Sequence, residues 1–353
     1  MARYRRSVRK HLRVAVLFGG TSEERDVSIA SAREVICALR ERGHHVLAVD
    51  TAHGALSSTD ERAVLDAPVG RRPPSEAELE RMSTSSTALV LPAELADNDI
   101  DVVFLALHGG SGEDGRIQSL LELAAIPYTG AGPLGSALAM DKDVAKRLFR
   151  AAGIDTPDWL TGAASAGEIV QRLGLPVVVK PNAQGSTVGL SLVRAEADVD
   201  AAVAVASEFG EVLFERFVPG REVTVGVLDG VALAVGEVAI PADSVFGYAD
   251  KYQVGAVVER FPADLPEPLA RHAQDVAAHA HRVLKLDGYS RSDFRLDAEG
   301  RLWLLEVNTL PGLTATSLLP QSAAAVGIEF GALCEHICEL GMQRAGGMAQ
   351  SGR

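Results

Sequence analysis

Four polar side chains with the chemistry of a metal and anion site lie close together in the C-terminal part of this 353-residue chain. They are Arg291, Asp293, Glu306 and Asn308. Apolar residues alternate with polar ones on both sides of the turn-forming segment 297–300, which predicts two strands joined as a hairpin. Side chains of a strand alternate between its faces, so the four polar groups would share one face. Two carboxylates and an amide oxygen beside an arginine suit Mg2+, which takes oxygen ligands and shares them with phosphates.

The register of this hairpin decides whether the carboxylates converge. If the turn has four residues, Asp293 lies opposite Leu304. The other face of the hairpin is then apolar and belongs to the core. It comprises Phe294, Leu296, Trp303, Leu305 and Val307. The alternative is an ordinary amphipathic hairpin with solvated charges, and the other motifs of the chain favour the metal site over it.

A second motif surrounds Lys180, which follows an apolar strand predicted at 177–180. The segment 181–189 is rich in glycine, serine and threonine, and another apolar strand is predicted at 190–193. A flap of this composition exposes backbone N–H groups and hydroxyls that can cover phosphates, and the lysine adds a point charge. It is not a P-loop, because the pattern G-x-x-x-x-G-K-[ST] is absent. A plain hairpin turn is the alternative.

Three further segments are typical of ligand contacts. His108 and the glycine-rich turn 109–115 follow a buried strand, at the end where α/β sheets bind ligands. His108 could contact a ligand or have a structural role. The apolar strand edge within 212–222, next to a carboxylate, could hold an adenine and a ribose. The polar and aromatic segment 243–252 is a candidate lid.

The composition limits the class of protein. Apolar residues make up 47% of the chain, enough for a large core, and no apolar run has the length of about 18 residues that a transmembrane helix needs. The formal net charge is −13, and residues 1–13 contain six Arg and Lys and no acid, which leaves −19 for the rest. Nucleic acid and membrane partners are therefore not expected. The basic start lacks the long apolar segment of a signal peptide, so we expect a frayed extension on a cytoplasmic protein.

Neither the cysteines nor the histidines suggest a disulfide or zinc site. The cysteines are Cys37, Cys334 and Cys338, and the last two are expected to be buried free thiols. The three histidines of the helix predicted at 267–285 fit no metal pair and are expected in solvent. They are His272, His279 and His281.

The N-terminal part alternates strand, helix and strand, which is typical of one half of a nucleotide-binding fold. Strands are predicted at 14–18 and 46–50, and the helix between them is predicted to begin at Ser28 as N-cap and to end before Gly43. The G-x-G-x-x-G pattern is absent, which argues against a dinucleotide. Residues 51–98 are predicted to be mostly loop. Further helices are predicted at 116–123, 141–152 and 195–208, and further strands at 101–107, 212–217 and 223–240.

Taken together and in this order, the motifs resemble those of the D-alanine–D-alanine ligases of the ATP-grasp superfamily. The resemblance runs from about residue 13 to residue 340. It rests on Gly-Gly-Thr-Ser-Glu-Glu24-Arg-Asp-Val-Ser, Ala-Leu-His108-Gly-Gly-Ser-Gly-Glu-Asp-Gly, Met-Asp-Lys142, Val-Lys180-Pro-Asn-Ala-Gln-Gly-Ser186, Tyr-Ala-Asp-Lys251-Tyr252 and Leu-Glu306-Val-Asn308-Thr-Leu-Pro-Gly312. The chain departs from the common pattern in its basic extension, its long segment 51–98 and Leu310, where a small or polar residue is frequent.

The resemblance implies a three-domain ATP-grasp fold of the α/β class, α+β in its central and C-terminal parts. The expected parts are a basic extension at 1–13, a Rossmann-like pre-ATP-grasp domain at 14–132, a central ATP-grasp domain at 133–215, a C-terminal ATP-grasp domain at 216–345 and a tail at 346–353.

It also implies an ADP-forming ligase of peptidoglycan precursor synthesis, acting in cell-wall formation and cell shape. ATP would phosphorylate the carboxylate of one D-alanine, and the amine of a second D-alanine would displace the phosphate. Two Mg2+ ions, with Mn2+ as an alternative, a homodimer and a cytoplasmic location are expected. The metal ligands would be Asp293, Glu306 and Asn308. The nucleotide would contact Lys142, Lys180, Gly185, Ser186, Glu215, Phe217, Val218, Glu222 and Lys251.

The same resemblance implies roles in binding and joining the amino acids. Glu24 would bind the first ammonium, and Arg291 with the Gly312 backbone N–H would hold the carboxylate and later the oxyanion. Ser186 and Tyr252 would join Glu24 in a hydrogen-bonded link that closes the flap and lid. Other substrate contacts would come from His108, Lys251, Ser317 and the Leu318 N–H, and Ser317 would also belong to the catalytic set.

Three alternatives remain open at this stage. A relative could use D-serine or D-lactate as acceptor, although Tyr252 favours an amine, because lactate-using relatives resemble this pattern with a histidine there. A non-catalytic nucleotide-binding protein would have little use for the complete metal set. Another ATP-grasp enzyme, such as a biotin-dependent carboxylase subunit, would not need the motifs around Glu24 and His108.

Overall fold

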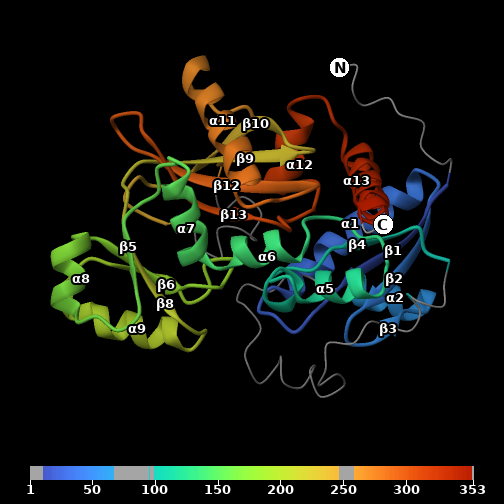
Figure 1. The fold of residues 1–353 in the computed structure, drawn as a ribbon, viewed down its shortest axis with the longest axis horizontal. Coiled ribbons are helices and arrows are strands. Elements are labelled where there is room, and N and C mark those ends of the chain that lie inside the picture. The colour runs from blue at the N-terminus through green and yellow to red at the C-terminus, as the bar shows by residue number, and fades with distance from the viewer. Residues whose placement is uncertain (1–10, 67–94, 96–98, 246–257, 352–353) are drawn as a thin grey trace.

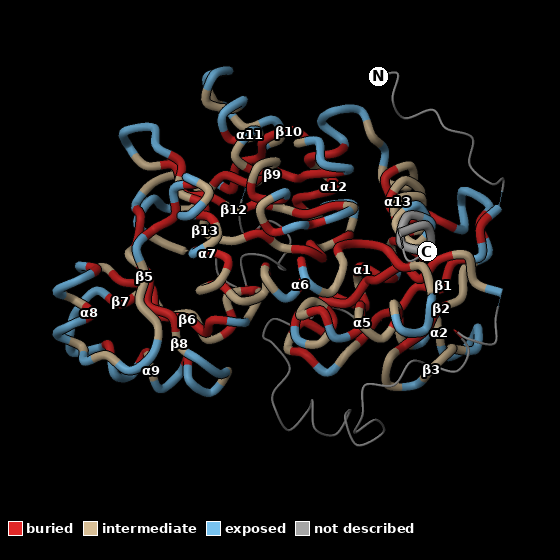
Figure 2. Tube along the Cα trace, viewed as in Figure 1, coloured by how far each residue is buried: buried red, intermediate tan, exposed pale blue. Residues whose placement is uncertain are grey.

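The computed structural model describes residues 11–66, 95, 99–245 and 258–351. These residues form three sheets with helices packed on them (Figure 1). The N-terminal sheet lies at the lower right of the view, the central sheet at the lower left and the C-terminal sheet above them. Buried residues concentrate in the sheets and in the helix faces that cover them (Figure 2).

The N-terminal sheet has the strand order β3-β2-β1-β4, and its central strand β1 pairs in parallel with β2 and β4. The strands are β1 Arg13–Phe18, β2 His45–Asp50, β3 Gly54–Ala55 and β4 Val102–Leu105. The helices of this part are α1 Arg25–Glu41, α2 Ser58–Leu65 and α5 Arg116–Leu123, and α5 has the predicted bounds. The predicted alternation of strand and helix is therefore confirmed.

The start of α1 differs from the prediction, because its N-cap is Glu24 and not Ser28. The Ser28 hydroxyl is used elsewhere. It accepts the Gly19 N–H at 2.8 Å and donates to the Ala106 carbonyl at 2.7 Å, so it joins the ends of β1 and β4. A serine can serve as N-cap only when its side chain is available to the helix N–H groups.

The central sheet is antiparallel, with the order β5-β8-β6-β7. Its strands are β5 Trp159–Thr161, β6 Val177–Pro181, β7 Ser191–Val193 and β8 Val212–Arg216. Helices α8 Ala166–Leu173 and α9 Val199–Ser207 share one apolar core with these strands. The β-branched run at the start of β6 is buried, as suits a strand between two neighbours.

The C-terminal sheet has the order β11-β10-β9-β12-β13. Its strands are β9 Arg221–Leu228, β10 Val231–Ala239, β11 Val258–Arg260, β12 Tyr289–Leu296 and β13 Leu302–Asn308. Helices α6 Pro133–Met140, α7 Lys142–Ala151 and α11 Glu267–Val283 contribute to its core. Helices α6 and α7 precede the central sheet in the chain but pack on this one, so residues 133–151 join the two parts.

The last two helices return the chain to the N-terminal part. Helix α12, Leu318–Ala324, contacts β9 and β10, whereas α13, Phe330–Ser351, packs against α1 and β4. Cys334 and Cys338 on α13 are buried free thiols, as predicted. Within the described ranges, every helix is too short or too polar to cross a membrane.

The β12–β13 hairpin forms, but its predicted register is wrong. Leu296 pairs with Leu302 around a longer turn, and Phe294 pairs with Leu304. The longer turn moves Leu302 and Leu304 into the core, so Trp303 and Leu305 are only half-buried. The predicted core positions Phe294, Leu296 and Val307 are confirmed.

A bulge then restores the polar face of the hairpin. The register shifts between Asp293 and Phe294, so Asp293 lies opposite Glu306, and Arg291 lies opposite Asn308. Residues that oppose each other in an antiparallel pair share a face. The predicted grouping of the four polar side chains is therefore confirmed, although a bulge produces it and not a regular turn.

Two of the three histidines on α11 also depart from the prediction. His281 is buried on α11, and its Nδ1 lies 2.8 Å from the Ser290 hydroxyl on β12. Burial lowers the pKa of His281 to about 4, which keeps the ring neutral. His272 is exposed as predicted, and His279 is half-buried.

Candidate active site

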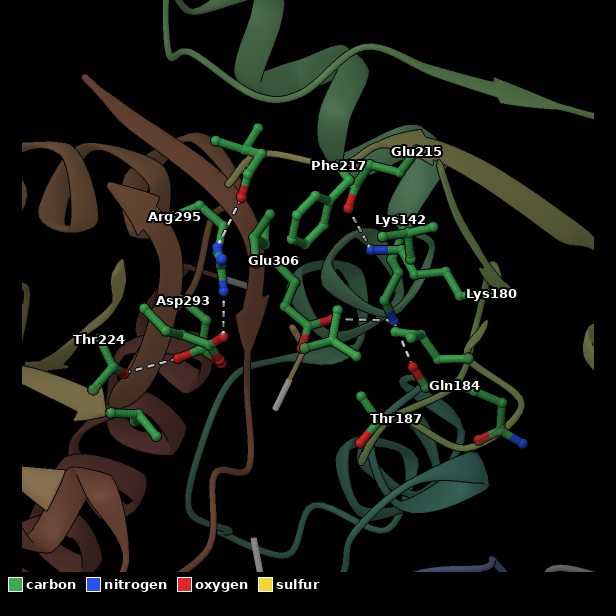
Figure 3. A pocket seen from close by; sticks show the side chains of 18 of the residues that line it. Lys142, Lys180, Gln184, Thr187, Glu215, Phe217, Thr224, Asp293, Arg295 and Glu306 are labelled. Atoms are coloured by element: carbon green, nitrogen blue, oxygen red, sulfur yellow. Dashed lines mark hydrogen bonds and ion pairs between the residues drawn. The ribbon is translucent and has the colours of Figure 1, made fainter. Parts of the chain in front are cut away.

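A pocket lies between the central and C-terminal sheets (Figure 3). Strands β6 and β8 and the glycine-rich flap form one side, and β9, β12 and β13 form the other. It brings together most of the residues predicted for nucleotide and metal. Its lining includes Lys142, Lys180, Gly185, Glu215, Phe217, Val218, Glu222, Arg291, Asp293, Glu306 and Leu318.

A buried carboxylate with two ammonium partners forms the deep end of this pocket. Lys180 Nζ donates to Glu215 Oε1 at 2.9 Å, and Lys146 Nζ lies 2.6 Å from Oε2. Lys146 also donates to the Thr156 hydroxyl and lies 5.3 Å from the centre of the Trp159 ring. Lys146 is not among the predicted site residues, although its place one turn after Lys142 on α7 is a signal.

Charge and burial act against each other in this cluster. Burial by itself would raise the pKa of Glu215, but Lys146 and Lys180 outweigh it and leave the pKa below its ordinary value. Burial lowers the pKa of Lys146 to about 8 despite the carboxylate. Glu215 is therefore an ionised hydrogen-bond acceptor at the inner wall of the pocket.

Glu215→Gln should destabilise the protein more than Lys146→Met. The first change leaves two buried ammonium groups without their carboxylate, and breaking a buried pair in this way costs about 3–5 kcal/mol of unfolding free energy. The second leaves the Lys180–Glu215 pair intact. Urea unfolding of both variants at pH 7 and pH 9 measures the difference. The loss of unfolding free energy in Glu215→Gln should be smaller at pH 9. Lys146 then loses its proton more readily in the folded state than in the unfolded chain. Equal deficits for the two variants would contradict this.

Lys142 connects the flap to the hairpin. Its Nζ donates to the Gln184 carbonyl at 2.6 Å and lies 3.3 Å from Glu306 Oε2, and its side chain is buried (Figure 3). Asp141 caps α7 by accepting the Val144 N–H, which fixes Lys142 at the first turn of the helix. The positive charge therefore sits between the two sides of the pocket.

Arg295 is a second residue of the pocket that is not among the predicted site residues. It lies on β12 between two buried apolar residues, and its own exposed fraction is 3%. The guanidinium donates to the backbone carbonyls of Val218, Gly220 and Ala242 and lies 3.4 Å from Glu222. The available signal was the alternation of β12, which puts Arg295 on the same face as Arg291 and Asp293. Arg295 fixes the shape of the loop after β8, where Phe217 and Val218 line the pocket.

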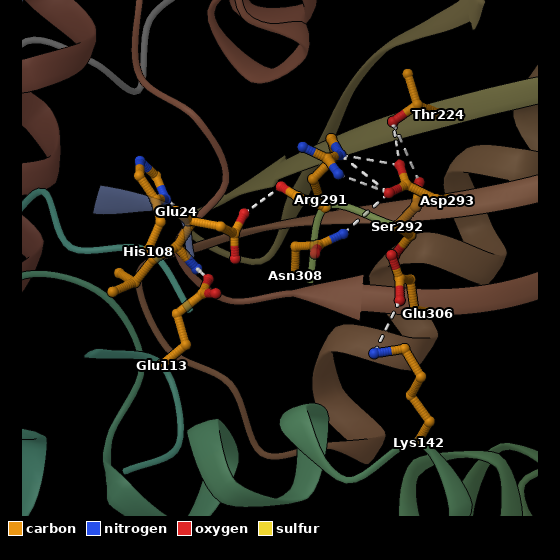
Figure 4. A network of polar contacts seen from close by, with 12 residues as sticks. Glu24, His108, Glu113, Lys142, Thr224, Arg291, Ser292, Asp293, Glu306 and Asn308 are labelled. Atoms are coloured by element: carbon orange, nitrogen blue, oxygen red, sulfur yellow. Dashed lines mark hydrogen bonds and ion pairs between the residues drawn. The ribbon is translucent and has the colours of Figure 1, made fainter. Parts of the chain in front are cut away.

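Asp293 is the centre of the hairpin's polar face (Figure 4). Arg291 donates to both of its oxygens, through Nε at 2.9 Å and Nη2 at 2.7 Å. The Thr224 hydroxyl and the Asn308 amide donate to the same carboxylate at 2.8 and 2.9 Å. These contacts orient Asp293 beside Glu306, its partner across the strands.

The donor set of this face fits a hard divalent cation. Asp293 and Glu306 supply carboxylate oxygens from opposing strands, and Asn308 adds an amide on the same face. No cluster of three or more His, Cys, Asp and Glu suited to a metal occurs in the described part of the chain. A third protein ligand would therefore be the Asn308 oxygen, with remaining positions for water and phosphate, as Mg2+ prefers.

The flap meets the N-terminal part at Glu24. The Ser186 hydroxyl donates to Glu24 Oε1, and both residues are buried. Ser186 and Thr187 have positive φ angles of 48° and 60°, a conformation that holds the turn of the flap. A Cβ at Gly185 would lie 2.6 Å from Glu24 Oε2, so only glycine leaves room for the carboxylate here. Two of the three members of the predicted link are thus in contact.

His108 has a structural role, one of the two alternatives that the sequence left open. Its Nδ1 lies 2.8 Å from the Leu310 carbonyl and its Nε2 lies 2.9 Å from the Ser31 hydroxyl, so protein groups occupy both ring nitrogens. Burial lowers the pKa of His108 to about 4. The ring joins the N-terminal part to the loop after β13.

Glu113 is not among the predicted site residues, but it also joins the N-terminal part to the loop after β13. It accepts the Gly109 N–H at 2.9 Å and the Leu310 N–H at 3.1 Å. Burial and the nearby Glu24 carboxylate raise the pKa of Glu113 to about 8. Its place in the glycine-rich motif was the available signal.

Three further predicted residues follow β13 in the chain. They are Gly312, Ser317 and Leu318. Ser317 is the N-cap of α12, and its Oγ accepts the Thr314 N–H at 3.1 Å. A Cβ at Gly312 would lie 3.0 Å from that Oγ, so the two residues are close neighbours. Leu318, the first residue of α12, lines the pocket. Lys251, Tyr252 and most of the predicted lid lie outside the described residues.

Family models match both halves of the chain. The model described as "D-ala D-ala ligase N-terminus" matches residues 13–131, and "D-ala D-ala ligase C-terminus" matches residues 148–339.

Individual relatives agree with these matches. D-alanine–D-alanine ligases from Nitratidesulfovibrio vulgaris (strain DP4) and Anaeromyxobacter sp. (strain K) are each 42% identical, covering 95% and 93% of this chain and 100% and 96% of their own. The Bacillus anthracis enzyme complexed with ATP has a TM-score of 0.73 at 29% identity, covering 96% of this chain and 99% of its own. The Coxiella burnetii enzyme has a TM-score of 0.78 at 26% identity, covering 97% of both.

Proposed function

The chain belongs to the D-alanine–D-alanine ligase family, and we propose from this premise how its pocket joins two D-alanines with cleavage of ATP. The fold is the ATP-grasp fold of these ligases, and the product is a peptidoglycan precursor for the cell wall. D-serine and D-lactate as acceptors are not favoured, since the curated relatives carry the D-alanine–D-alanine name. The observation that carries the proposal is the arrangement of two lysines, the hairpin carboxylates and Arg291 around one pocket, whose flap contacts Glu24 through Ser186.

The chemical task is to bring two anions together. A carboxylate oxygen of the first D-alanine forms a bond to the terminal phosphorus of ATP, and ADP leaves. Lys142 and Lys180 point into the pocket and would neutralise phosphate charge. Asp293, Glu306 and Asn308 would hold Mg2+, or Mn2+, which supplies further charge neutralisation and orients the phosphates when bound. We propose two such ions for this donor set.

The nucleotide base and ribose would occupy the deep end of the pocket. Glu215 is an ionised acceptor there, and an adenine offers an exocyclic amine as donor. Phe217 and Val218 supply apolar surface, and Glu222 supplies a carboxylate for the ribose hydroxyls. Gly185 and Ser186 would cover the phosphates from the flap, together with Lys251.

The amino acids would occupy the other end. Glu24 would bind the ammonium of the first D-alanine, and Arg291 with the Gly312 N–H would hold its acyl oxygen. The amine of the second D-alanine loses a proton and attacks the acyl carbon, and phosphate leaves. The oxygen that becomes negative in between is stabilised by those two donors, which act where charge develops.

The second D-alanine needs a site for its own carboxylate. Ser317 and the Leu318 N–H would provide it at the start of α12, where unpaired backbone N–H groups favour an anion. Tyr252 would complete the link of Glu24 and Ser186 over both amino acids, and His108 would support this end of the site. We further propose a cytoplasmic homodimer.

Phosphate release tests the proposal directly. The protein with ATP and Mg2+ should release phosphate with D-Ala alone and form the dipeptide. L-Ala and D-Ser alone should support little release, and D-lactate added to D-Ala should yield little mixed product in competition. Release with L-Ala equal to that with D-Ala, or D-Ala–D-lactate as the main product, would contradict the assignment.

A further inference from the structure

The loop that follows β13 is held by the N-terminal part of the chain. The Leu310 N–H donates to Glu113 Oε1 at 3.1 Å, and the Leu310 carbonyl lies 2.8 Å from His108 Nδ1. Three residues later, the Leu313 N–H donates to the Ser31 hydroxyl at 3.2 Å. Both leucine side chains are buried, with exposed fractions of 2% and 1%. The loop is therefore fixed on both sides of the short segment between them.

Each hydrogen bond of this contact can be assigned one donor and one acceptor. A carbonyl can only accept, so His108 donates from Nδ1 to Leu310 and its Nε2 accepts the Ser31 hydroxyl proton, 2.9 Å away. That hydroxyl keeps a lone pair for the Leu313 N–H. The second oxygen of Glu113 accepts the Gly109 N–H.

The segment enclosed by these contacts contains Gly312. Its backbone N–H is the proposed oxyanion donor, and its Cα lies beside the Ser317 hydroxyl of the acceptor site. The side chains of Glu113, His108 and Ser31 lie outside the C-terminal sheet. They come from α1 and from the turn that precedes α5. The direction of the Gly312 N–H thus depends on another part of the chain.

We propose that Glu113, His108 and Ser31 are positioning residues that set the direction of the Gly312 N–H for the tetrahedral intermediate. This inference rests on the function proposed above. Donors to a developing oxyanion act only when they are in place before the charge forms, and a displacement of about 1 Å can cost about 100-fold in rate. Glu113 carries the most weight, because it holds Leu310 and the glycine-rich turn at once.

Glu113→Gln tests this with little change of shape. In either protonation state both carboxyl oxygens of Glu113 keep a lone pair, whereas the amide nitrogen of glutamine has none to offer a backbone N–H. One of the two backbone bonds is therefore lost. We expect kcat to fall by about 10- to 100-fold with the KM for ATP within twofold of wild type. A phosphinate mimic of the tetrahedral intermediate, bound with ATP, should lose affinity by a similar factor, whereas ADP binding should not change.

Glu122→Gln on α5 is the matched control. Glu122 accepts the Tyr128 hydroxyl at 2.9 Å, which an amide oxygen can also do, so its kcat should equal that of wild type. If urea unfolding shows that Glu113→Gln does not fold, Ser31→Ala takes its place, since it removes the acceptor of the Leu313 N–H and should lower kcat in the same selective way.

The outcomes separate this inference from the proposed function. Dipeptide synthesis by wild type with an unchanged kcat in Glu113→Gln overturns the positioning role alone. A fall in kcat with unchanged phosphinate affinity overturns it as well, because the oxyanion donor would then be intact. A wild-type protein that forms no dipeptide overturns the function itself.

Discussion

Replacing Glu306 with glutamine should lower turnover by roughly 1,000-fold or more while the fold survives. The change keeps the shape of the side chain but removes one negative charge from the proposed Mg2+ site. A metal ion contributes several kcal/mol to the stabilisation of a transferring phosphoryl group. Each 1.4 kcal/mol corresponds to a factor of ten in rate. Glu306 faces Lys142 at 3.3 Å and lies opposite Asp293, so an amide there weakens both the cation site and the contact with the flap lysine.

Steady-state phosphate release over a range of Mg2+ concentrations measures this effect. Glu299→Gln is the control, because Glu299 is exposed in the turn of the same hairpin and should have wild-type activity. Urea unfolding should give similar stabilities for both variants. Turnover of Glu306→Gln near the wild-type value at saturating Mg2+ would show that the side chain does not hold the metal.

The second large effect is expected for Arg291→Lys. The substitution keeps the charge but loses the planar fork that donates through Nε and Nη2 to Asp293 and suits a carboxylate or an oxyanion. Loss of one oxyanion donor costs about 100- to 1,000-fold in turnover. The orientation of Asp293 would also relax, since Thr224 and Asn308 would then hold it without the guanidinium.

Separate determination of kcat and of the KM for each substrate checks this prediction. Arg260→Lys on the edge strand β11 of the same sheet is the control, because Arg260 is exposed and lies outside the pocket. An effect of Arg291→Lys that is confined to the KM for ATP would place the guanidinium's role at the nucleotide and not at the acyl oxygen.

Much of the chemistry of the site could be predicted from local patterns. The polar face of the β12–β13 hairpin, Lys180 at the base of the flap and the glycine-rich turn after His108 are all readable, because residue type and alternation over a few positions decide them. The bounds of α5 were predicted correctly for the same reason. Apolar residues at helical spacing, after the glycine that ends the preceding turn, suffice to place that helix.

The register of the hairpin marks the limit of such reasoning. Alternation predicts that Asp293 and Glu306 share a face, but their pairing depends on a longer turn and a bulge at Leu305. A bulge leaves no clear signal in a single sequence, because the extra residue is as apolar as its neighbours. Packing of Leu304 and Val307 on the core decides where it falls.

The sequence by itself thus determined the family, the kind of chemistry and the residues that we propose to meet the ligands. Tertiary structure alone decided which residues support them. Lys146 becomes the counter-ion of Glu215 only because the fold brings its side chain on α7 to β8, and His108 and Glu113 reach Leu310 across separations of 202 and 197 residues. Local periodicity carries no information about such distant contacts. The packing of the sheets and helices decides these contacts. A buried charged or polar group is stable only where a group from another part of the chain forms a hydrogen bond or an ion pair with it.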